Sequence, residues 1–271
     1  MNTSVRTTGF EQLVALFFLA GAVGAQAPAG TELVPIPAGP FTMGSDNGPD
    51  DERPSHRVDV AAFSIDRTPV TNAQAAEFLN AKGPTGPKGD DWFQWDDADA
   101  RVRRKGDRWV PDAGYENHPI LEFSWSGARE YCAWVGKRLP TETEWEKAAR
   151  GTDGRQFPWG NAAPDRKRAQ HNAGWAGTAP VGQLSSGASP YGVLDLSGNA
   201  WEWVSSLYRP YPYDAKDGRE DPVSGEERAT RGGGQDSPAA HLTTTYRGRG
   251  LSRGPRGGHH NIGFRCALSK A

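Results

Sequence analysis

The 271-residue chain carries 31 Lys and Arg residues against 33 Asp and Glu residues, and a formal net charge of −2 argues against a general polyanion binder, so we expect no nucleic-acid partner. Its 34 Gly, 21 Pro and 10 Trp residues are the unusual part of the composition. Because glycine and proline interrupt helices and strands, and because tryptophans need a core, we expect a loop-rich α+β domain of short elements packed around buried tryptophans.

The N-terminus has the pattern of an export signal. Arg6 lies in a short polar region, an apolar run follows from Leu13 to Ala25, and small residues suited to cleavage lie near Ala25 or Ala27. We therefore predict a signal peptide over residues 1–25 and a periplasmic or secreted mature protein. The apolar run is short for a membrane span, and no later run approaches that length, so we expect no membrane contact after cleavage. The alternative is an N-terminal anchor helix that is never cleaved.

The segment after the signal is predicted to form strands and then a helix. Residues 32–46 predict a short strand, a turn and a second strand, because Pro and Gly separate two apolar stretches. Residues 56–71 continue with the alternation typical of strands. A helix is then predicted after Thr71, whose hydroxyl can cap it, with Phe78 and Leu79 on its apolar face.

Two further helices are predicted after a polar stretch. Residues 82–117 contain prolines and are rich in Asp and Arg, so we expect a long surface excursion there. One helix is predicted to begin after Ser124 or Ser126. The next is predicted after Thr141, because Glu144 follows three residues later as in a capping box.

Beyond Gly151, which is expected to close the third helix, the pattern changes to turns and short strands up to the C-terminus. The sequence shows no internal repeat and no clear linker. One domain is therefore the better count.

Several segments, in order along the chain, carry a family resemblance. They are PAGPFTMGS, TPVTNAQAAEFL, HPILEFSWSGAREYCAWVGKRLPTETEWEKAARG, FPWGN, SPYGVLDLSGNAWEWVSS, RATRGGG and NIGFRCAL. Together they resemble the formylglycine-generating enzyme, or sulfatase-modifying factor, family over residues 33–268. The resemblance implies a C-type-lectin-like fold with little regular secondary structure, and it does not by itself imply the activity.

The resemblance also shows which reactive groups are missing. In catalytic family members two active-site cysteines bind copper(I), a soft ion suited to thiolates, and a substrate cysteine is oxidised to formylglycine with oxygen. Aligning RGGGQDSPAAHL with the family pattern places Ser237 and Leu242 at those two positions. A serine is a poor ligand for soft copper, and a leucine is none. We therefore expect the copper chemistry to be absent.

The chain has two cysteines, Cys132 and Cys266, which are compatible with one disulfide in an oxidising compartment. They match two family positions that are joined by a disulfide in relatives, so the resemblance implies this pairing. The alternative is a pair of buried free thiols.

The segment LDLSGNAWEW resembles the family's calcium loop. On that resemblance the ligands are the Asp195 and Glu202 carboxylates and the Gly198 and Ala200 carbonyls, an all-oxygen set that suits calcium. The alternative is a turn packed by tryptophans, with Glu202 held by an arginine. Asn172 matches one ligand of the family's other calcium site, whose acidic ligand has no clear counterpart here.

The remaining candidates surround the position of the family's substrate site. Asp236 and Ser237 are expected to face the substrate cleft, and His241 with His260 is a conceivable pair of metal ligands or acid–base groups. His259 adjoins His260, and adjacent residues of a strand point to opposite faces, so both cannot serve one metal without distortion. The alternative is that these are hydrogen-bonded loop histidines.

Four arginines follow the same region. They can line a groove for a carboxylate or a peptide backbone, or lie in a solvated loop with salt bridges to the acidic excursion. They are Arg247, Arg249, Arg253 and Arg256.

Two functional hypotheses follow from these residues. One is an exported maturation or oxidation factor that acts on a peptide or siderophore precursor bound in the cleft, in a branch of the family that resembles a periplasmic pyoverdine-maturation protein. The other is a binding or assembly module without catalysis. A true formylglycine-generating oxidase is disfavoured by the two missing thiols.

Overall fold

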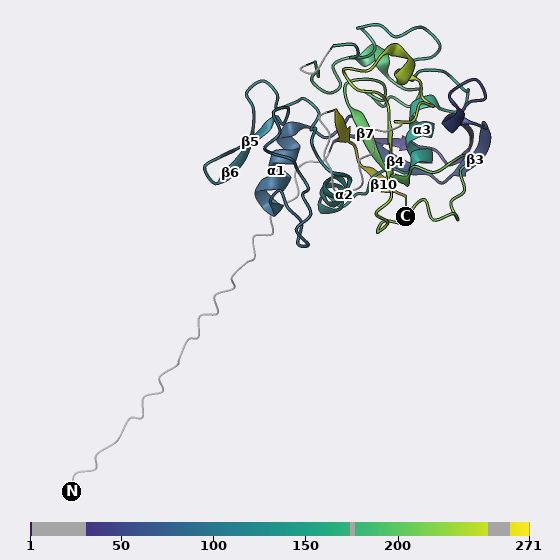
Figure 1. The fold of residues 1–271 in the computed structure, drawn as a ribbon. Coiled ribbons are helices and arrows are strands. Elements are labelled where there is room, and N and C mark those ends of the chain that lie inside the picture. The colour runs from purple at the N-terminus through teal and green to yellow at the C-terminus, as the bar shows by residue number, and fades with distance from the viewer. Residues whose placement is uncertain (2–30, 174–176, 249–260, 271) are drawn as a thin grey trace.

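The structure is a computed structural model that describes residues 1, 31–173, 177–248 and 261–270, and the predicted signal peptide lies almost wholly outside them. The described part is an α+β fold with little regular structure, as predicted (Figure 1). Its helices are α1 (Asn72–Lys82), α2 (Trp125–Trp134) and α3 (Glu142–Arg150), with the short 3₁₀ helices η1 (Asp50–Glu52), η2 (Ser185–Gly187) and η3 (Ala239–Leu242). None of the described helices is long and apolar enough to cross a membrane.

The strands form small sheets whose partners are distant in sequence. The first sheet has the order β1 (Leu33–Ile36), β4 (Phe63–Asp66) and β10 (Ala267–Ser269), so it joins the start of the described body to its end. A second sheet pairs β2 (Gly39–Met43) with β3 (His56–Val60), and β5 (Val102–Lys105) forms a hairpin with β6 (Arg108–Pro111). The last sheet has β7 (Trp201–Leu207) at its centre, antiparallel to β8 (Arg228–Arg231) and parallel to β9 (Ile262–Phe264).

The helix boundaries follow the predicted caps. Thr71 and Gln74 form a capping box at α1, and the Ser124 hydroxyl accepts from the Gly127 N–H at α2. Thr141 and Glu144 form the predicted capping box at α3. These bonds satisfy backbone N–H groups that a helix leaves unpaired, which is why the signal is readable from local sequence.

The prediction that residues 82–117 are a surface excursion is wrong for three of its aromatic residues, although Trp95 is exposed. Trp92, Phe93 and Trp109 are buried in the same core cluster as α1 and α2. The Asn80 side chain bonds both the N–H and the carbonyl of Trp109, which fixes the β5–β6 hairpin against α1. The polar composition of this stretch concealed a few large side chains whose burial outweighs it.

The predicted disulfide is confirmed between Cys132 and Cys266. It links α2 to the residue just before β10, inside the first core cluster. A second core cluster surrounds Trp145 of α3 and packs against residues of β1, β2, β4 and β7.

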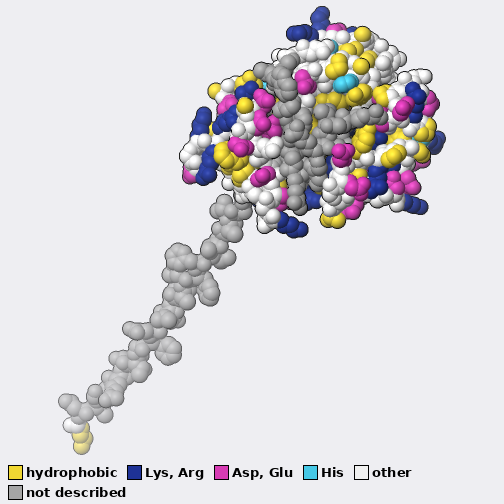
Figure 2. Space-filling view, in the orientation of Figure 1, with side chains coloured by type: hydrophobic (Ala, Val, Ile, Leu, Met, Phe, Trp, Pro, Cys, Tyr) yellow, Lys and Arg dark blue, Asp and Glu magenta, His cyan; other side chains and the backbone are white. Residues whose placement is uncertain are grey.

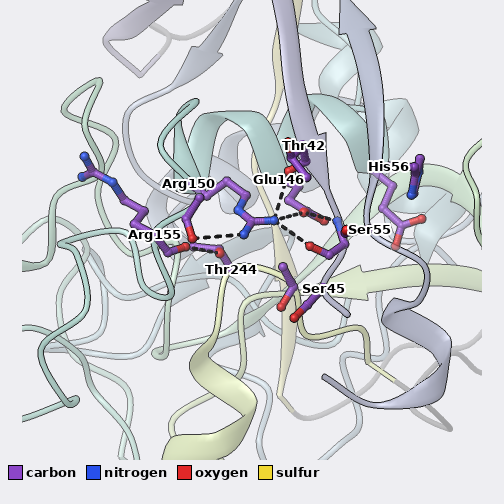
Figure 3. A network of polar contacts seen from close by, with 12 residues as sticks. Thr42, Ser45, Ser55, His56, Glu146, Arg150, Arg155 and Thr244 are labelled. Atoms are coloured by element: carbon purple, nitrogen blue, oxygen red, sulfur yellow. Dashed lines mark hydrogen bonds and ion pairs between the residues drawn. The ribbon is translucent and has the colours of Figure 1, made fainter. Parts of the chain in front are cut away.

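Buried ion pairs join α3 to β8 and to the segment that follows η3. Arg231 of β8 contacts Glu142 at 3.4 Å and Glu146 at 2.6 Å, and all three side chains are fully buried. Arg247 contacts the same Glu142 at 2.7 Å, and Arg150 contacts Glu146 at 3.1 Å. These contacts form one network, which we call the buried arginine network. Figure 3 shows its Arg150–Glu146 end.

Candidate functional site

A pocket of about 220 Å³ opens where the start of β7, the turn after β8, η3 and the start of β9 meet. Three of the predicted cleft residues, Asp236, Ser237 and His241, line it together. The other described residues that line it are Trp201, Pro238, Tyr246, Gly248 and Asn261.

The glycines after β8 bring these side chains together. Gly232 and Gly233 have φ values of 100° and 75°, which side-chain-bearing residues rarely adopt. A Cβ atom on Gly233 would lie 2.7 Å from the Leu242 side chain and 3.0 Å from the His241 carbonyl oxygen. The turn therefore packs directly on η3, and this places Asp236 and Ser237 beside His241.

The side chains of Asp236 and Ser237 each make hydrogen bonds within the protein and each keep hydrogen-bonding capacity for a ligand. The half-buried Asp236 carboxylate accepts from the Asn261 amide, with Nδ2 at 3.2 and 3.4 Å from its two oxygens. Ser237 is buried, and its hydroxyl oxygen accepts from the Gly234 N–H at 2.9 Å. Asp236 therefore keeps acceptor capacity for a ligand, and the Ser237 hydroxyl keeps its proton to donate.

His241 is a possible acid–base group in this pocket. Its ring stacks on Tyr246 with centroids 4.2 Å apart and lies 6.2 Å from the Trp201 ring. Burial lowers the pKa of His241, although the Asp236 charge opposes that effect. The imidazole is therefore neutral near pH 7 and able to accept a proton.

Position 242 contributes no chemistry to the pocket. The Leu242 side chain is fully buried in a small apolar cluster with Phe157 and Ala169. Its carbonyl oxygen accepts from the Ser197 hydroxyl at 2.7 Å. Of the two positions predicted to align with the family's thiols, Ser237 presents a hydroxyl and Leu242 faces an apolar cluster.

Of the remaining histidine and arginine candidates, the structure describes only Arg247. Arg247 is buried against Glu142, so neither the groove nor the solvated loop predicted for it is correct. His259, His260, Arg249, Arg253 and Arg256 lie outside the described residues.

The predicted calcium loop is a tight turn in which Glu202 has protein partners. Asp195, Gly198 and Asn199 have φ values of 56°, 82° and 68°. Glu202 accepts from Arg265 at 2.6 and 2.7 Å and from the Trp145 indole at 2.8 Å. These contacts occupy most of the lone-pair positions of one carboxylate and match the arginine-held alternative for Glu202.

Asp195 fits a calcium ion better than Glu202 does. Burial raises the pKa of the Asp195 carboxyl, and one backbone N–H, from Gly182 at 2.6 Å, donates to it. Within residues 31–173, 177–248 and 261–270, no three His, Cys, Asp or Glu side chains gather as metal ligands. Calcium at this loop would therefore depend on Asp195 and on the backbone carbonyls of Gly198 and Ala200, and it stays a prediction.

Asn172, the candidate for a second calcium site, has an exposed side chain that contacts the His171 ring nitrogen at 3.1 Å. Its φ is 49°. The neighbouring residues 174–176 lie outside the described part of the chain, so this candidate also stays a prediction.

Sequence reasoning missed several residues that line the pocket, namely Trp201, Tyr246 and Asn261. Asn261 begins the NIGFRCAL segment, and Trp201 lies inside LDLSGNAWEW. Asn261 and Trp201 could therefore have been predicted, because each is a polar or aromatic residue inside a segment that carries the family resemblance. Tyr246 carried no such signal.

Asp195→Asn tests calcium binding with little change in shape. If calcium binds the folded state alone, it raises stability by about 2.7 kcal/mol at a hundredfold excess over its dissociation constant. We expect calcium to raise the melting temperature of the wild type and to raise that of Asp195→Asn less. Asp107→Asn, an equal charge change at an exposed hairpin position, is the control and should respond to calcium as the wild type does.

Glu202→Gln completes that experiment, because it should lower stability with or without calcium by weakening the Arg265 pair. Thermal melts of all four proteins, in chelator and in millimolar calcium, provide the measurement. A wild type whose melting temperature ignores calcium would rule the site out.

Comparison with known proteins agrees with this geometry. The family model described as "Sulfatase-modifying factor enzyme 1-like domain" matches residues 20–270. The formylglycine-generating enzyme of Bos taurus is 35% identical over 88% of this chain and 74% of that protein. The inactive C-alpha-formylglycine-generating enzyme 2 of Mus musculus is also 35% identical, over 90% of this chain and 87% of its own length.

A solved structure shows the same fold. PvdO from Pseudomonas aeruginosa superposes with a TM-score of 0.65 at 25% identity, covering 89% of this chain and 95% of that one. With the family match over most of the sequence, the chain belongs to the sulfatase-modifying factor family, whose members include the formylglycine-generating enzymes.

Proposed function

We propose that this protein is an exported member of its family that lacks both active-site cysteines and that matures or oxidises a peptide, or a peptide-derived siderophore precursor, bound in the pocket at Asp236, Ser237 and His241. The observation that carries the proposal is the convergence of a carboxylate, a hydroxyl and an imidazole in one pocket. The sequence resemblance predicts that one of the family's thiol positions, Ser237, belongs to it. Such a set can bind and deprotonate a substrate, and it contains no thiolate of the kind that suits copper(I).

The roles of the three residues follow from their contacts. Asp236, oriented by Asn261, offers acceptor oxygens to an N–H or O–H of the substrate. His241 accepts a proton from the reacting group, and its stacking on Tyr246 holds the ring in place. Ser237 donates its hydroxyl proton to a substrate carbonyl. Because these three side chains are not redox-active, an oxidation in this pocket needs a two-electron acceptor, for which we propose dioxygen. The substrate loses two electrons and two protons, and dioxygen is reduced to hydrogen peroxide.

The likeness to PvdO supports the family fold on which this proposal rests, and the apolar N-terminal run supports export. The surface also agrees with a peptide or small-molecule ligand rather than a polyanion. Figure 2 shows Lys and Arg side chains interspersed with Asp and Glu over the visible face.

A binding or assembly module without catalysis is the second candidate. The observation that favours it is the 35% identity to a mouse relative whose name marks it as inactive. In that case the same pocket would bind its ligand without changing it, and His241 would serve only in packing.

The catalytic proposal is tested with extracts from a strain that lacks this protein. These extracts contain the exported peptides and siderophore precursors. We expect the purified protein to convert one component to a product that has lost two hydrogen atoms, as mass spectrometry would show. His241→Gln should abolish the conversion. His118→Gln is the matched control, because His118 also has a pKa lowered by burial and does not line the pocket.

The pH dependence of that conversion adds a second readout. The pKa of His241 is lowered, so the neutral base persists below the usual histidine value of about 6.5. The rate should stay near its plateau at that pH and fall only as the pH drops further. An extract that the protein leaves unchanged, or full activity of His241→Gln, would contradict the catalytic proposal. A component that binds the protein but is not changed would favour the second candidate, a binding module.

The two missing thiols make a separate prediction. The mature protein should not convert a sulfatase-type cysteine peptide to formylglycine, with or without copper, because Ser237 and Leu242 occupy the thiol positions of the alignment. Mass spectrometry of the peptide after incubation is the measurement. Detection of the aldehyde product would overturn this conclusion.

A further inference from the structure

A separate pocket of about 290 Å³ is formed by the β5–β6 hairpin, the residues directly after α1, and Trp95. We call it the hairpin pocket. Its volume is close to the lower limit for ligand sites, about 300 Å³, so it suits a ligand of about one ring. Figure 1 shows the hairpin beyond α1, at the end of the body away from α3. The described residues that line it, none of which lines the pocket at Asp236, are Gly83, Pro84, Trp95, Arg104, Asp107 and Trp109.

Two tryptophans form the apolar wall of the hairpin pocket. The ring centroids of Trp95 and Trp109 are 6.1 Å apart, and the planes of the two indoles differ by 65°. Trp95 is 49% exposed, whereas the other tryptophans that the structure describes are buried or half-buried. An indole that is open to this extent offers an apolar face that a flat ligand can cover.

The indole N–H of Trp109 has no partner among the described residues. Trp109 is 7% exposed, and its hydrogen bonds to the Asn80 side chain use its backbone groups. Of the other buried tryptophans that the structure describes, Trp201 also has an indole without such a partner, and it lines the pocket at Asp236. The rest each donate to a protein oxygen, namely Trp92, Trp125, Trp145 and Trp203. Because a buried indole usually has an acceptor, the Trp109 N–H is left for one that the protein does not provide.

The walls of the hairpin pocket are held in place by hydrogen bonds. The Asn80 amide bonds both the N–H and the carbonyl of Trp109 at 2.8 Å. Arg103 Nη1 donates to the Trp95 carbonyl at 3.3 Å, and the Pro84 carbonyl accepts from two backbone N–H groups of the next loop. The pocket is therefore formed before a ligand binds, which lowers the entropy that binding must cost.

The rim of the hairpin pocket has one side chain that donates and one that accepts. Arg104 lies opposite Trp109 in the hairpin, so the two side chains share a face of it. Arg104 Nε donates to the Gly106 carbonyl at 3.2 Å, and no described residue accepts from its Nη atoms. Asp107 lines the same pocket, and its carboxylate accepts from none of the described residues. The rim can therefore both donate to a ligand and accept from it.

This set of groups distinguishes between ligands that would cover an indole. A proline-rich segment has carbonyls that accept from Arg104 and Trp109, but its prolines have no N–H to donate to Asp107. A sugar ring has hydroxyls that both donate and accept, and its C–H groups suit the negative face of an indole. A sugar therefore matches the apolar wall and both rim residues.

We propose that the hairpin pocket binds one ring of a sugar, either a free sugar or the end of a glycan. The C–H face of the ring lies on the Trp95 indole, and one of its oxygens accepts from the Trp109 N–H. Its hydroxyls accept from Arg104 and donate to Asp107. This binding site does not depend on the function proposed for the pocket at Asp236.

Indole N–H signals in nitrogen-15 NMR spectra of the full mature protein test the ligand class. Glucose, galactose and N-acetylglucosamine are the ring probes. Sorbitol, which has the hydroxyls of a hexose without the ring, and a capped hexaproline peptide are the controls. We expect at least one ring sugar to shift the Trp95 and Trp109 signals at millimolar concentration, and both controls to bind at least about tenfold more weakly. No shift with any ring sugar, or binding of either control within about tenfold of the best sugar, would overturn the proposal.

An oligosaccharide that ends in the best ring separates the two sources of the sugar. Tighter binding than that of the single ring would support the end of a glycan, and equal or weaker binding would support a free sugar.

Variants locate the bound ring. Trp95→Ala removes an exposed side chain, so it should fold normally and weaken binding at least about tenfold, whereas Val223→Ala, at another exposed apolar position, should not. Trp95→Phe retains an aromatic face and should retain part of the binding. Arg104→Gln should weaken binding at least about threefold, whereas Arg108→Gln, the same change on the other face of the hairpin, should not. Full binding by Trp95→Ala, or equal losses in Arg104→Gln and its control, would place the sugar elsewhere and overturn the assignment.

Discussion

The pairing of Arg231 with Glu146 and Glu142 is the contact on which the rest of this structure depends. All three side chains are fully buried, and Arg231 is also the last residue of β8, directly before the glycine turn that carries Asp236 and Ser237. Its guanidinium lies 5.3 Å from the centre of the Trp145 ring, and the Trp145 indole donates to Glu202, which Arg265 holds. One continuous chain of polar contacts therefore runs from α3 through β8 and β7 to the residue after β9.

This arrangement explains how the pocket keeps its shape without thiols. In a fold with so little regular secondary structure, loops need anchors, and buried carboxylates provide them by accepting from arginines that also bond loop carbonyls. Arg231 donates to the carbonyls of Thr244 and Thr245, and Arg247 donates to that of Asp51. The same anchors thus fix the residues on either side of Tyr246, which lines the pocket. Burying such charges has a desolvation cost, so removing a single partner is strongly destabilising.

The parts of the fold that sequence predicted are those governed by local contacts. Thr71, Ser124 and Thr141 were identifiable as caps because each bonds a backbone N–H three residues away. The burial of Trp109 and Arg247 was not predictable in that way, since Arg247 meets Glu142 across 105 residues of chain. In the candidate site, Asp236 and Ser237 were predicted through the family resemblance, and His241 was predicted as an acid–base or metal-binding candidate in the same segment.

The most direct test of this account is the coupling energy between Arg231 and Glu146, which are 2.6 Å apart. Urea unfolding of Arg231→Met, Glu146→Gln and the double variant would measure it. The account predicts that each single change lowers the free energy of unfolding by about 3–5 kcal/mol. It also predicts that the double variant loses less than the sum of the two by at least about 1 kcal/mol. Additive losses below about 1 kcal/mol each, the size found for exposed pairs, would contradict the claim that this buried network holds the site together.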